Sequence, residues 1–177
     1  MNTLFTVVGN SGAGKTTIMR KTNLLELVSF TTRQPREGES NGVDYYFIDD
    51  AKFNALYQSG QVIEHHNHFG THYGLTAEEF YGKMAKGNAF SIVDIHGMNM
   101  LKALYPKTVS IFIYNTYEEA VVNMKARGDS DDKIAKRLET YHWEVAQRKF
   151  CDFVVKNTNG KLGAVTNIIQ DIVASVA

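Results

Sequence analysis

The stretch GNSGAGKT at residues 9–16 decides the fold of this chain. It matches the pattern G-x-x-x-x-G-K-[ST], follows the apolar run LFTVV (4–8) and precedes a segment with helical periodicity over 15–23. A strand, a glycine-rich turn and a helix in this order form a loop whose backbone N–H groups surround phosphate oxygens. An ordinary glycine turn is the alternative, and the full match in this context favours binding of a nucleoside triphosphate.

Each residue type in this loop has a chemical reason to be there. The glycines allow a tight turn that aims successive N–H groups inward. The Lys15 ammonium can reach the terminal phosphates, and the Thr16 hydroxyl can ligate Mg²⁺. The helix that starts near Lys15 adds its positive N-terminal end. The predicted contacts to the triphosphate are Gly9, Asn10, Ser11, Gly12, Ala13, Gly14, Lys15, Thr16 and Thr17.

Composition narrows the class of protein. The 177 residues are 44% hydrophobic, which is enough for one good core and one domain. Lys plus Arg and Asp plus Glu both number 19, so the basic excess typical of a nucleic-acid binder is missing. One cysteine, no basic leader and no apolar stretch of about 20 residues predict a cytoplasmic protein without a membrane span.

Short apolar runs alternate with helical patterns along the chain, which indicates an α/β protein with a largely parallel sheet. The predicted helices cover 15–23, 97–104, 116–126 and 162–176. The predicted central strands are LFTVV (4–8), LELVSF (25–30), FSIVDI (90–95), VSIFIY (109–114) and FVV (153–155).

Two segments interrupt the alternation. Residues 33–76 are rich in glycine and aromatic residues, and the alternating DYYF (44–47) and VIEHH (62–66) predict a small antiparallel insertion. Residues 118–149 are highly charged, and composition alone favours a solvated helical pair there.

A phosphate-binding loop alone does not distinguish a kinase from a GTPase or a motor ATPase. The chain has no N/T-K-x-D stretch of the kind that specifies guanine in GTPases. A short chain with two polar insertions fits a small-molecule kinase, which closes over both substrates to exclude water. Asp94, at the end of the predicted strand, could hold the metal through a water molecule.

With these pieces in place, the chain resembles the guanylate kinase family over nearly its full length. The order and spacing of several further pieces carry the resemblance: Ser29, TTRQPREGE (31–39), GVDYYF (42–47), VIEHHNHFGTHYG (62–74), VDI (93–95), KARGD (125–129), KRL (136–138) and VVKN (154–157). It implies a P-loop NTPase core (1–32, 77–117 and 150–177), a small mixed or antiparallel insertion for GMP (33–76) and a helical lid (118–149). The implied reaction moves the γ-phosphoryl of ATP to GMP, and also to dGMP, with Mg²⁺.

The resemblance assigns the loop SFTTRQPREGE (29–39) to the acceptor monophosphate. Arg33 and Arg36 would supply two planar forks for the phosphate, because a guanidinium matches phosphate geometry. Ser29, Tyr45 and Tyr73 would add hydroxyl contacts. A solvated surface loop is the alternative on the sequence of the loop alone.

Further roles follow from the same resemblance. Glu64 would accept from guanine N1–H and the 2-amino group, a donor pair that adenine lacks. Arg127 and Arg137 would move in with the lid and neutralise charge on the transferring phosphoryl. Asn157 would lie near the adenine of ATP, and Asp94 would be a catalytic residue that also contacts GMP. No general base is needed, because the acceptor phosphate, with a second pKa of about 6, is already ionised.

The chain departs from the family pattern at four places. Leu75 stands where the family has a Ser or Thr that contacts guanine O6, and Thr76 could substitute from the next position. His96 replaces the second acid after Asp94 in the Asp-Ile-Asp stretch, so we expect one negative charge fewer near the acceptor and the metal. Asn123 replaces a lid arginine. The segment between Lys15 and Ser29 is about six residues shorter than usual, so the first helix must end early.

These departures leave alternatives open. A kinase of the same fold could act on another nucleoside monophosphate or on a ribosyl phosphate, and Leu75 and His96 favour that reading. A non-catalytic domain that binds phosphopeptides is disfavoured by the intact P-loop. His65, His66, His68 and His72 are expected to line the acceptor cleft rather than to bind zinc, because no cysteine completes a tetrahedral set. The oligomeric state is left open.

Overall fold

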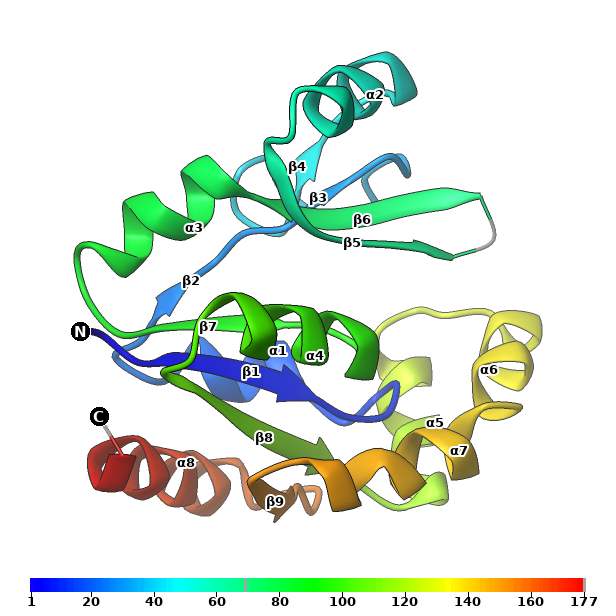
Figure 1. The fold of residues 1–177 in the computed structure, drawn as a ribbon. Helices are drawn as coiled ribbons and strands as arrows, with labels where there is room; N and C mark the ends of the chain where they lie inside the picture. Colours follow the sequence, from blue (N-terminus) through cyan, green and yellow to red (C-terminus); the bar gives the residue numbers. More distant parts are fainter. Residues whose placement is uncertain (69, 177) are drawn as a thin grey trace.

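A computed structural model of the protein describes residues 1–68 and 70–176. Phe69 and Ala177 lie outside the described residues, as does the side chain of His68. Figure 1 shows two layers, a lower one built on a parallel sheet and an upper one built on a smaller sheet, with a group of helices beside them.

The lower sheet has the strand order β2-β7-β1-β8-β9, and every neighbouring pair is parallel. Its strands are β1 (Leu4–Val8), β2 (Leu25–Glu26), β7 (Ala89–Ile92), β8 (Thr108–Tyr114) and β9 (Phe153–Lys156). The prediction of a parallel sheet is confirmed. The prediction that FVV (153–155) is a central strand is wrong, because β9 is an edge strand and Val154 is 47% exposed.

Two hydrophobic clusters cover the two faces of this sheet. Leu4 belongs to the first cluster with Met98 and Leu101 of α4 (Ile95–Leu104), and the next residue, Phe5, belongs to the second. The second cluster includes residues of α1 (Lys15–Met19) and α8 (Leu162–Val176). A strand covered on both faces needs apolar residues at successive positions, and this explains the continuous run LFTVV.

The upper sheet has the order β4-β3-β6-β5. Its strands are β3 (Phe30–Thr31), β4 (Tyr46–Phe47), β5 (Val62–His68) and β6 (Thr71–Thr76). β3 pairs antiparallel with β6 and parallel with β4, so the sheet is mixed, which agrees with the expected mixed or antiparallel insertion. Helix α2 (Asp50–Gln58) lies between β4 and β5 in the chain and was not predicted; the side chain of Asp49 caps it by accepting from the Lys52 N–H.

The run LELVSF (25–30) is not the single strand that the sequence predicted. Its first two residues form β2 in the lower sheet, and Phe30 begins β3 in the upper sheet (Figure 1). Leu27 and Val28 between them remain buried. One apolar run therefore supplies an edge strand to one sheet and an inner strand to the other, and it links the two layers.

The segment 118–149 forms three α-helices and a short 3-10 helix rather than a helical pair. They are α5 (Tyr117–Ala126), α6 (Asp131–Leu138), α7 (Tyr141–Ala146) and η1 (Gln147–Phe150). Ala120, Met124, Ile134 and Tyr141 form a small core of their own. We call α5, α6 and α7 the lid helices.

The remaining helices agree with the sequence in part. Helix α1 ends at Met19, so the expectation that the first helix stops early is confirmed, whereas its predicted extension to residue 23 is wrong. Helix α3 (Ala77–Met84), capped by Thr76, was not among the predicted helices. Within the described residues, no helix combines the length and apolar character required to cross a bilayer.

Candidate active site

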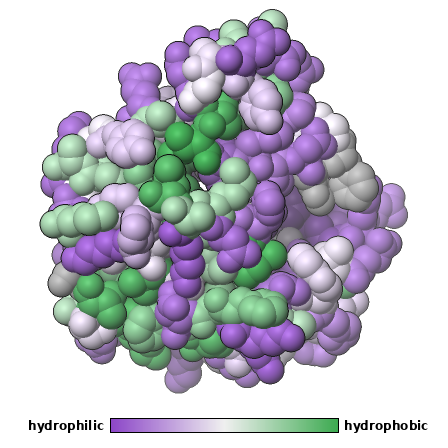
Figure 2. All heavy atoms as spheres, in the orientation of Figure 1, coloured by the Kyte–Doolittle hydropathy of each residue, from purple (hydrophilic) through white to green (hydrophobic). Residues whose placement is uncertain are grey.

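One open cleft of about 1040 Å³ lies between the P-loop, the upper sheet and the lid helices. Figure 2 shows that hydrophilic residues cover much of this face and that the surface is hollowed beside the lid. The predicted site residues that line the cleft are Gly9, Ser11, Gly12, Ala13, Gly14, Lys15, Thr16, Thr17, Arg33, Arg36, Tyr45, Tyr73, Asp94, Arg127, Arg137 and Asn157. Four predicted residues do not line it: Asn10, Ser29, Glu64 and Thr76.

The P-loop turns at glycines that have positive φ. Gly12 and Gly14 both have φ of 77°, a backbone conformation that other residues adopt at a cost. Gly12 also packs closely on the lid, because a Cβ there would lie 2.8 Å from the Ala120 carbonyl oxygen of α5. The glycines that predicted the motif are therefore required by both conformation and space.

Lys15 is folded back over its own loop. Its Nζ donates to the carbonyl oxygens of Gly9 at 2.7 Å and Asn10 at 3.0 Å. Burial lowers the pKa of Lys15 to about 8, and the carboxylate of Glu144 partly opposes this shift. The amine therefore loses part of its charge within the range of mildly alkaline pH.

Asparagine side chains fasten the P-loop to distant elements. Asn123 of α5 and Asn115, just after β8, both donate from Nδ2 to the Gly12 carbonyl oxygen, at 2.8 and 3.0 Å. Asn157 donates to the Ala13 oxygen at 2.9 Å, and Asn10 is fully buried and donates to Asn115 Oδ1 at 2.8 Å. Asn123, expected only as a missing cation, thus holds the loop in place. These bonds hold the carbonyl groups of Gly12 and Ala13 in fixed directions.

The lid reaches the same loop from the other side. Glu144 of α7 accepts a hydrogen bond from the Ser11 N–H at 3.1 Å, and Arg137 of α6 donates to Ser11 Oγ at 3.1 Å. Burial, followed by the charge of Arg127, lowers the pKa of Arg137. A carboxylate thus occupies one of the backbone donors that the motif offers to phosphate.

The two arginines of the upper layer form an organised group with Glu39. The Arg33 guanidinium donates to both carboxylate oxygens of Glu39, at 2.6 and 2.7 Å, and Arg36 donates its backbone N–H to the same carboxylate at 2.8 Å. The Arg33 bond holds the pKa of Glu39 at about 2. The Arg36 guanidinium is the more exposed of the two, with 45% of its side chain accessible.

Aromatic rings pack against the guanidinium of Arg33. Its guanidinium lies 5.0 Å from the centre of the Tyr45 ring, and Tyr45 meets Tyr73 edge-on at 5.9 Å between ring centres. Burial raises the pKa of Tyr45. Ser29 lines a smaller adjoining pocket with Arg33, Arg36 and Tyr45. The predicted monophosphate group is therefore gathered around one corner of the cleft, with Ser29 behind it.

Asp94 and Arg127 complete the polar lining. Asp94 follows β7, is exposed to the cleft and caps α4 by accepting from the Gly97 N–H at 2.8 Å. Arg127 ends α5 and pairs with Asp129. His96 is exposed and does not line the cleft.

Glu64 lies behind the cleft wall rather than on it. Only 2% of the residue is exposed, and Oε1 has no hydrogen-bond partner. A Cβ on Gly97 would lie 2.7 Å from this oxygen, so the glycine makes room for the carboxylate. His66, two residues along the same strand, places Nδ1 3.8 Å from Glu64 Oε1, and the ring lines the cleft.

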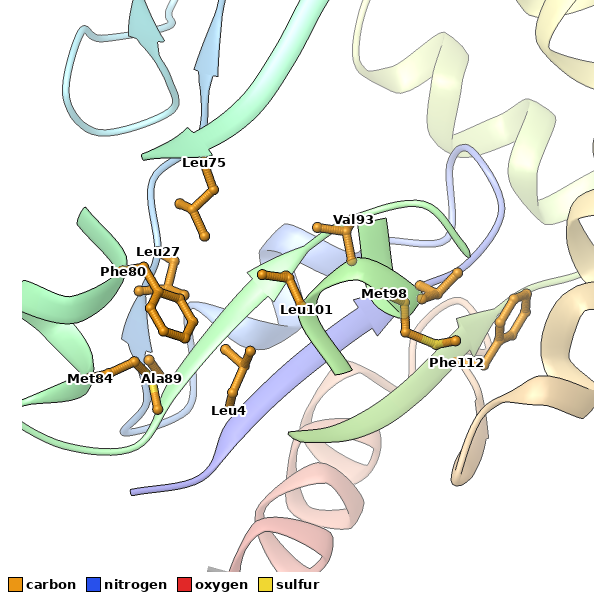
Figure 3. Packing of buried hydrophobic residues seen from close by; sticks show 11 residues of the cluster. Leu4, Leu27, Leu75, Phe80, Met84, Ala89, Val93, Met98, Leu101 and Phe112 are labelled. Atoms are coloured by element: carbon orange, nitrogen blue, oxygen red, sulfur yellow. The ribbon is translucent and has the colours of Figure 1, made fainter. Parts of the chain in front are cut away.

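Leu75 and Thr76 have structural contacts. Leu75 is fully buried in the first hydrophobic cluster and points from the end of β6 toward it (Figure 3). Thr76 caps α3 by accepting from the Glu79 N–H at 3.3 Å. The side chain at position 75 therefore offers no hydrogen-bonding group to a ligand.

The histidines divide into two groups. His66 lines the cleft as expected, whereas His65 and His72 are bonded to each other at 2.8 Å and stack on Phe53 of α2. The expectation that all of them face the acceptor is therefore wrong for these two, and the side chain of His68 lies outside the described residues. Among the described side chains, no group of three or more His, Cys, Asp or Glu could hold a metal ion.

Sequence reasoning missed Glu39, Asn115 and Glu144 as members of this site. Glu39 lies six residues after Arg33 and could have been paired with it from its charge. Asn115 and Glu144 reach the P-loop from more than 100 residues away, and their residue types alone carry no such signal.

The fold and the cleft together define a P-loop protein in which a second group of cations, Arg33 and Arg36, lines the same cleft as the P-loop. The sequence profile described as guanylate kinase matches residues 1–175. The chain is 33% identical to the guanylate kinase of Thermobifida fusca, over 96% of this chain and 88% of that protein. It is 35% identical to that of Chlorobium chlorochromatii, over 94% and 90%. The crystal structure of guanylate kinase from Anaplasma phagocytophilum superposes with a TM-score of 0.76 at 26% identity, covering 98% of this chain and 85% of that one. The chain belongs to the guanylate kinase family.

Proposed function

We propose that this protein is an ATP-dependent nucleoside monophosphate kinase that transfers the γ-phosphoryl of ATP to GMP and dGMP, giving ADP and GDP or dGDP. The observation that carries the proposal is that one cleft holds two separate cationic groups. Lys15 and the P-loop form one group, and Arg33 with Arg36 forms the other. Family membership supports guanine nucleotides as the acceptors.

The P-loop is the donor side of this proposal. Its N–H groups and Lys15 would bind the β- and γ-phosphates, and Asn157 would lie near the adenine. For the P-loop to receive phosphate, the Glu144 carboxylate must leave the Ser11 N–H. Arg137 and Arg127 line the same cleft and would then face the transferring phosphoryl group.

The acceptor side is the corner around Arg33. Arg33, Arg36, Tyr45 and Tyr73 would hold the monophosphate, with Ser29 as a contact from the adjoining pocket. Glu39 already holds Arg33 in a fixed orientation, which reduces the side-chain entropy lost on binding. Glu64 would accept from the guanine N1–H and 2-amino groups, because its Oε1 is buried without a partner. Thr76 stays a predicted contact, although its hydroxyl caps α3.

The donor set in the cleft fits Mg²⁺. The Thr16 hydroxyl and the Asp94 carboxylate are both hard oxygen donors, and both line the cleft. Mg²⁺ in kinases keeps several waters and is held mainly by substrate phosphates, so few protein ligands are required. The ion would neutralise phosphate charge while Lys15 and the arginines orient the oxygens.

We propose the same division of the chain that the sequence suggested. The core would be 1–32, 77–117 and 150–177, the GMP-binding insertion 33–76 and the lid 118–149. Closure of the insertion and lid over both nucleotides would exclude water from the reacting phosphates.

The test is to incubate the protein with ATP, Mg²⁺ and GMP and to quantify ADP and GDP together. A kinase forms both in equal amounts, and Lys15→Ala lowers turnover by about a thousandfold or more. Hydrolysis of ATP without formation of GDP would contradict the proposal. So would a phosphopeptide affinity that is unchanged by Lys15→Ala in a protein without turnover, since that is the behaviour of a binding domain.

A further inference from the structure

Two buried polar atoms that make no hydrogen bond lie side by side at the wall of the cleft, one on the cleft-lining His66 and one on Glu64 behind it. They are Oε1 of Glu64 and Nδ1 of His66, and 3.8 Å separates them. Buried polar atoms are almost always hydrogen-bonded in folded proteins, so an unpaired adjacent acceptor and ring nitrogen indicate a place where a ligand supplies the partners. The two side chains lie two residues apart on β5 and so project from the same face of the strand.

The ring of His66 is held in a defined position. It stacks on Tyr73 with 5.2 Å between ring centres and 9° between ring planes, and it lines the cleft. The Glu64 carboxylate, and then Asp94, raise the pKa of His66, while burial opposes them. The Glu64 carboxylate, whose Oε1 lies 3.8 Å from Nδ1, favours the His66 tautomer that carries its proton on Nδ1.

The position across the sheet from Glu64 offers no donor. Leu75 pairs with Glu64 in the β5–β6 register and is fully buried in the first hydrophobic cluster (Figure 3). Thr76 is committed to the cap of α3. If a base presents donors to Glu64 and an acceptor atom beside them, that acceptor atom must find its hydrogen-bond donor on another residue of the protein. His66 lies next to the Glu64 carboxylate and is the residue placed to donate.

Guanine presents this combination of groups. Its N1–H and 2-amino groups are donors, and O6, attached to the carbon beside N1, is an acceptor. Adenine has an amino donor in place of O6, which would meet an N–H donor head-on. A carboxylate with an adjacent N–H donor thus attracts guanine and repels adenine at the same edge, which gives specificity by both attraction and repulsion.

We propose that His66 is a second specificity-determining residue of the acceptor site, and that its Nδ1–H donates to O6 of guanine beside Glu64. The inference rests on the proposed function, since it assumes that guanine nucleotides are the acceptors. It places the recognition of O6 on β5 instead of on the buried position 75 of β6.

The test compares kcat/KM for GMP and AMP in the wild type, His66→Ala and His66→Asn. His66→Ala lowers kcat/KM for GMP about tenfold through KM and does not lower that for AMP, because one hydrogen bond to the base is lost. His66→Asn retains part of the GMP activity and raises AMP activity, because its amide can present either a donor or an acceptor. The matched control is His65→Asn, which alters the neighbouring histidine that packs on α2 and leaves the GMP/AMP ratio unchanged.

The outcomes separate the inference from the function on which it rests. An unchanged GMP/AMP ratio in a folded, active His66→Ala protein overturns the role of His66 and leaves the kinase assignment standing. An equal fall for both nucleotides also overturns it, because His66 would then act through Tyr73 on the phosphate. A wild type that does not phosphorylate GMP refutes the proposed function itself. Thermal unfolding of each variant shows whether a loss comes from the fold.

Discussion

Binding of nucleotide to the P-loop is expected to draw a proton onto Lys15. In the free protein, burial lowers the pKa of Lys15 to about 8. At pH 8.5 roughly a quarter of the molecules then carry the ammonium, and at pH 7 roughly nine tenths do. Phosphates placed beside Nζ favour the charged form and raise this pKa again. Lys15 should therefore take up roughly 0.8 proton on binding at pH 8.5 and roughly 0.1 at pH 7.

The assay is isothermal titration of ADP into the protein in buffers of different ionisation enthalpy. The slope of the observed binding enthalpy against the ionisation enthalpy gives the number of protons exchanged. At pH 8.5 the phosphates of ADP are already fully ionised, so they contribute no proton. Lys15→Arg is the matched control, because a guanidinium stays charged and should remove the uptake. No buffer dependence at pH 8.5, or equal uptake in Lys15→Arg, would refute the assignment of Lys15 as the buried phosphate ligand.

Three further substitutions test other contacts of the site. Glu144→Gln removes the negative charge that competes with phosphate for the Ser11 N–H. The Kd for ADP at pH 7 should therefore fall about three- to tenfold in a titration. A higher Kd in the variant would contradict this competition. Glu39→Gln removes a carboxylate whose pKa of about 2 lies below the ordinary 4.5. A lowered carboxylate pKa stabilises the folded state fully above pH 4.5, and this stabilisation is lost as the pH falls toward 2. The wild type should therefore lose roughly 1–2 kcal/mol more than Glu39→Gln between pH 5 and pH 3 in urea unfolding, after allowance for solvent screening of the Arg33 pair, and parallel curves would contradict this. Leu75→Ser should lower the free energy of unfolding by about 3 kcal/mol and Leu75→Met by less than about 1.5, and a cost below about 1 kcal/mol for the serine would show that position 75 is not packed as described.

The sequence predicted best those features that are decided locally. The P-loop was found because its glycines and Lys15 must follow one another at fixed spacing for the backbone to turn. The parallel sheet was found because strands buried on both faces need continuous apolar runs. The split of residues 25–30 between two sheets could not be read in this way, since a buried apolar run looks the same whether it stays in one sheet or crosses to another.

The site was predictable where one residue type has one chemical use. Arg33, Arg36 and Lys15 are cations in recognisable patterns, and the structure places them on one cleft. Glu144 and Asn115 act on the P-loop from distant parts of the chain, so only the fold brings them there.

We expect this cleft to select a guanine nucleoside monophosphate as the acceptor of the γ-phosphoryl group of ATP. Steady-state turnover with ATP, Mg²⁺ and each of GMP, dGMP, IMP, AMP and UMP tests it directly. We expect kcat/KM for GMP and dGMP to be about a hundredfold or more above that for AMP and UMP, because a base without two adjacent donors leaves the buried carboxylate of Glu64 unpaired. An AMP value equal to that for GMP would contradict it.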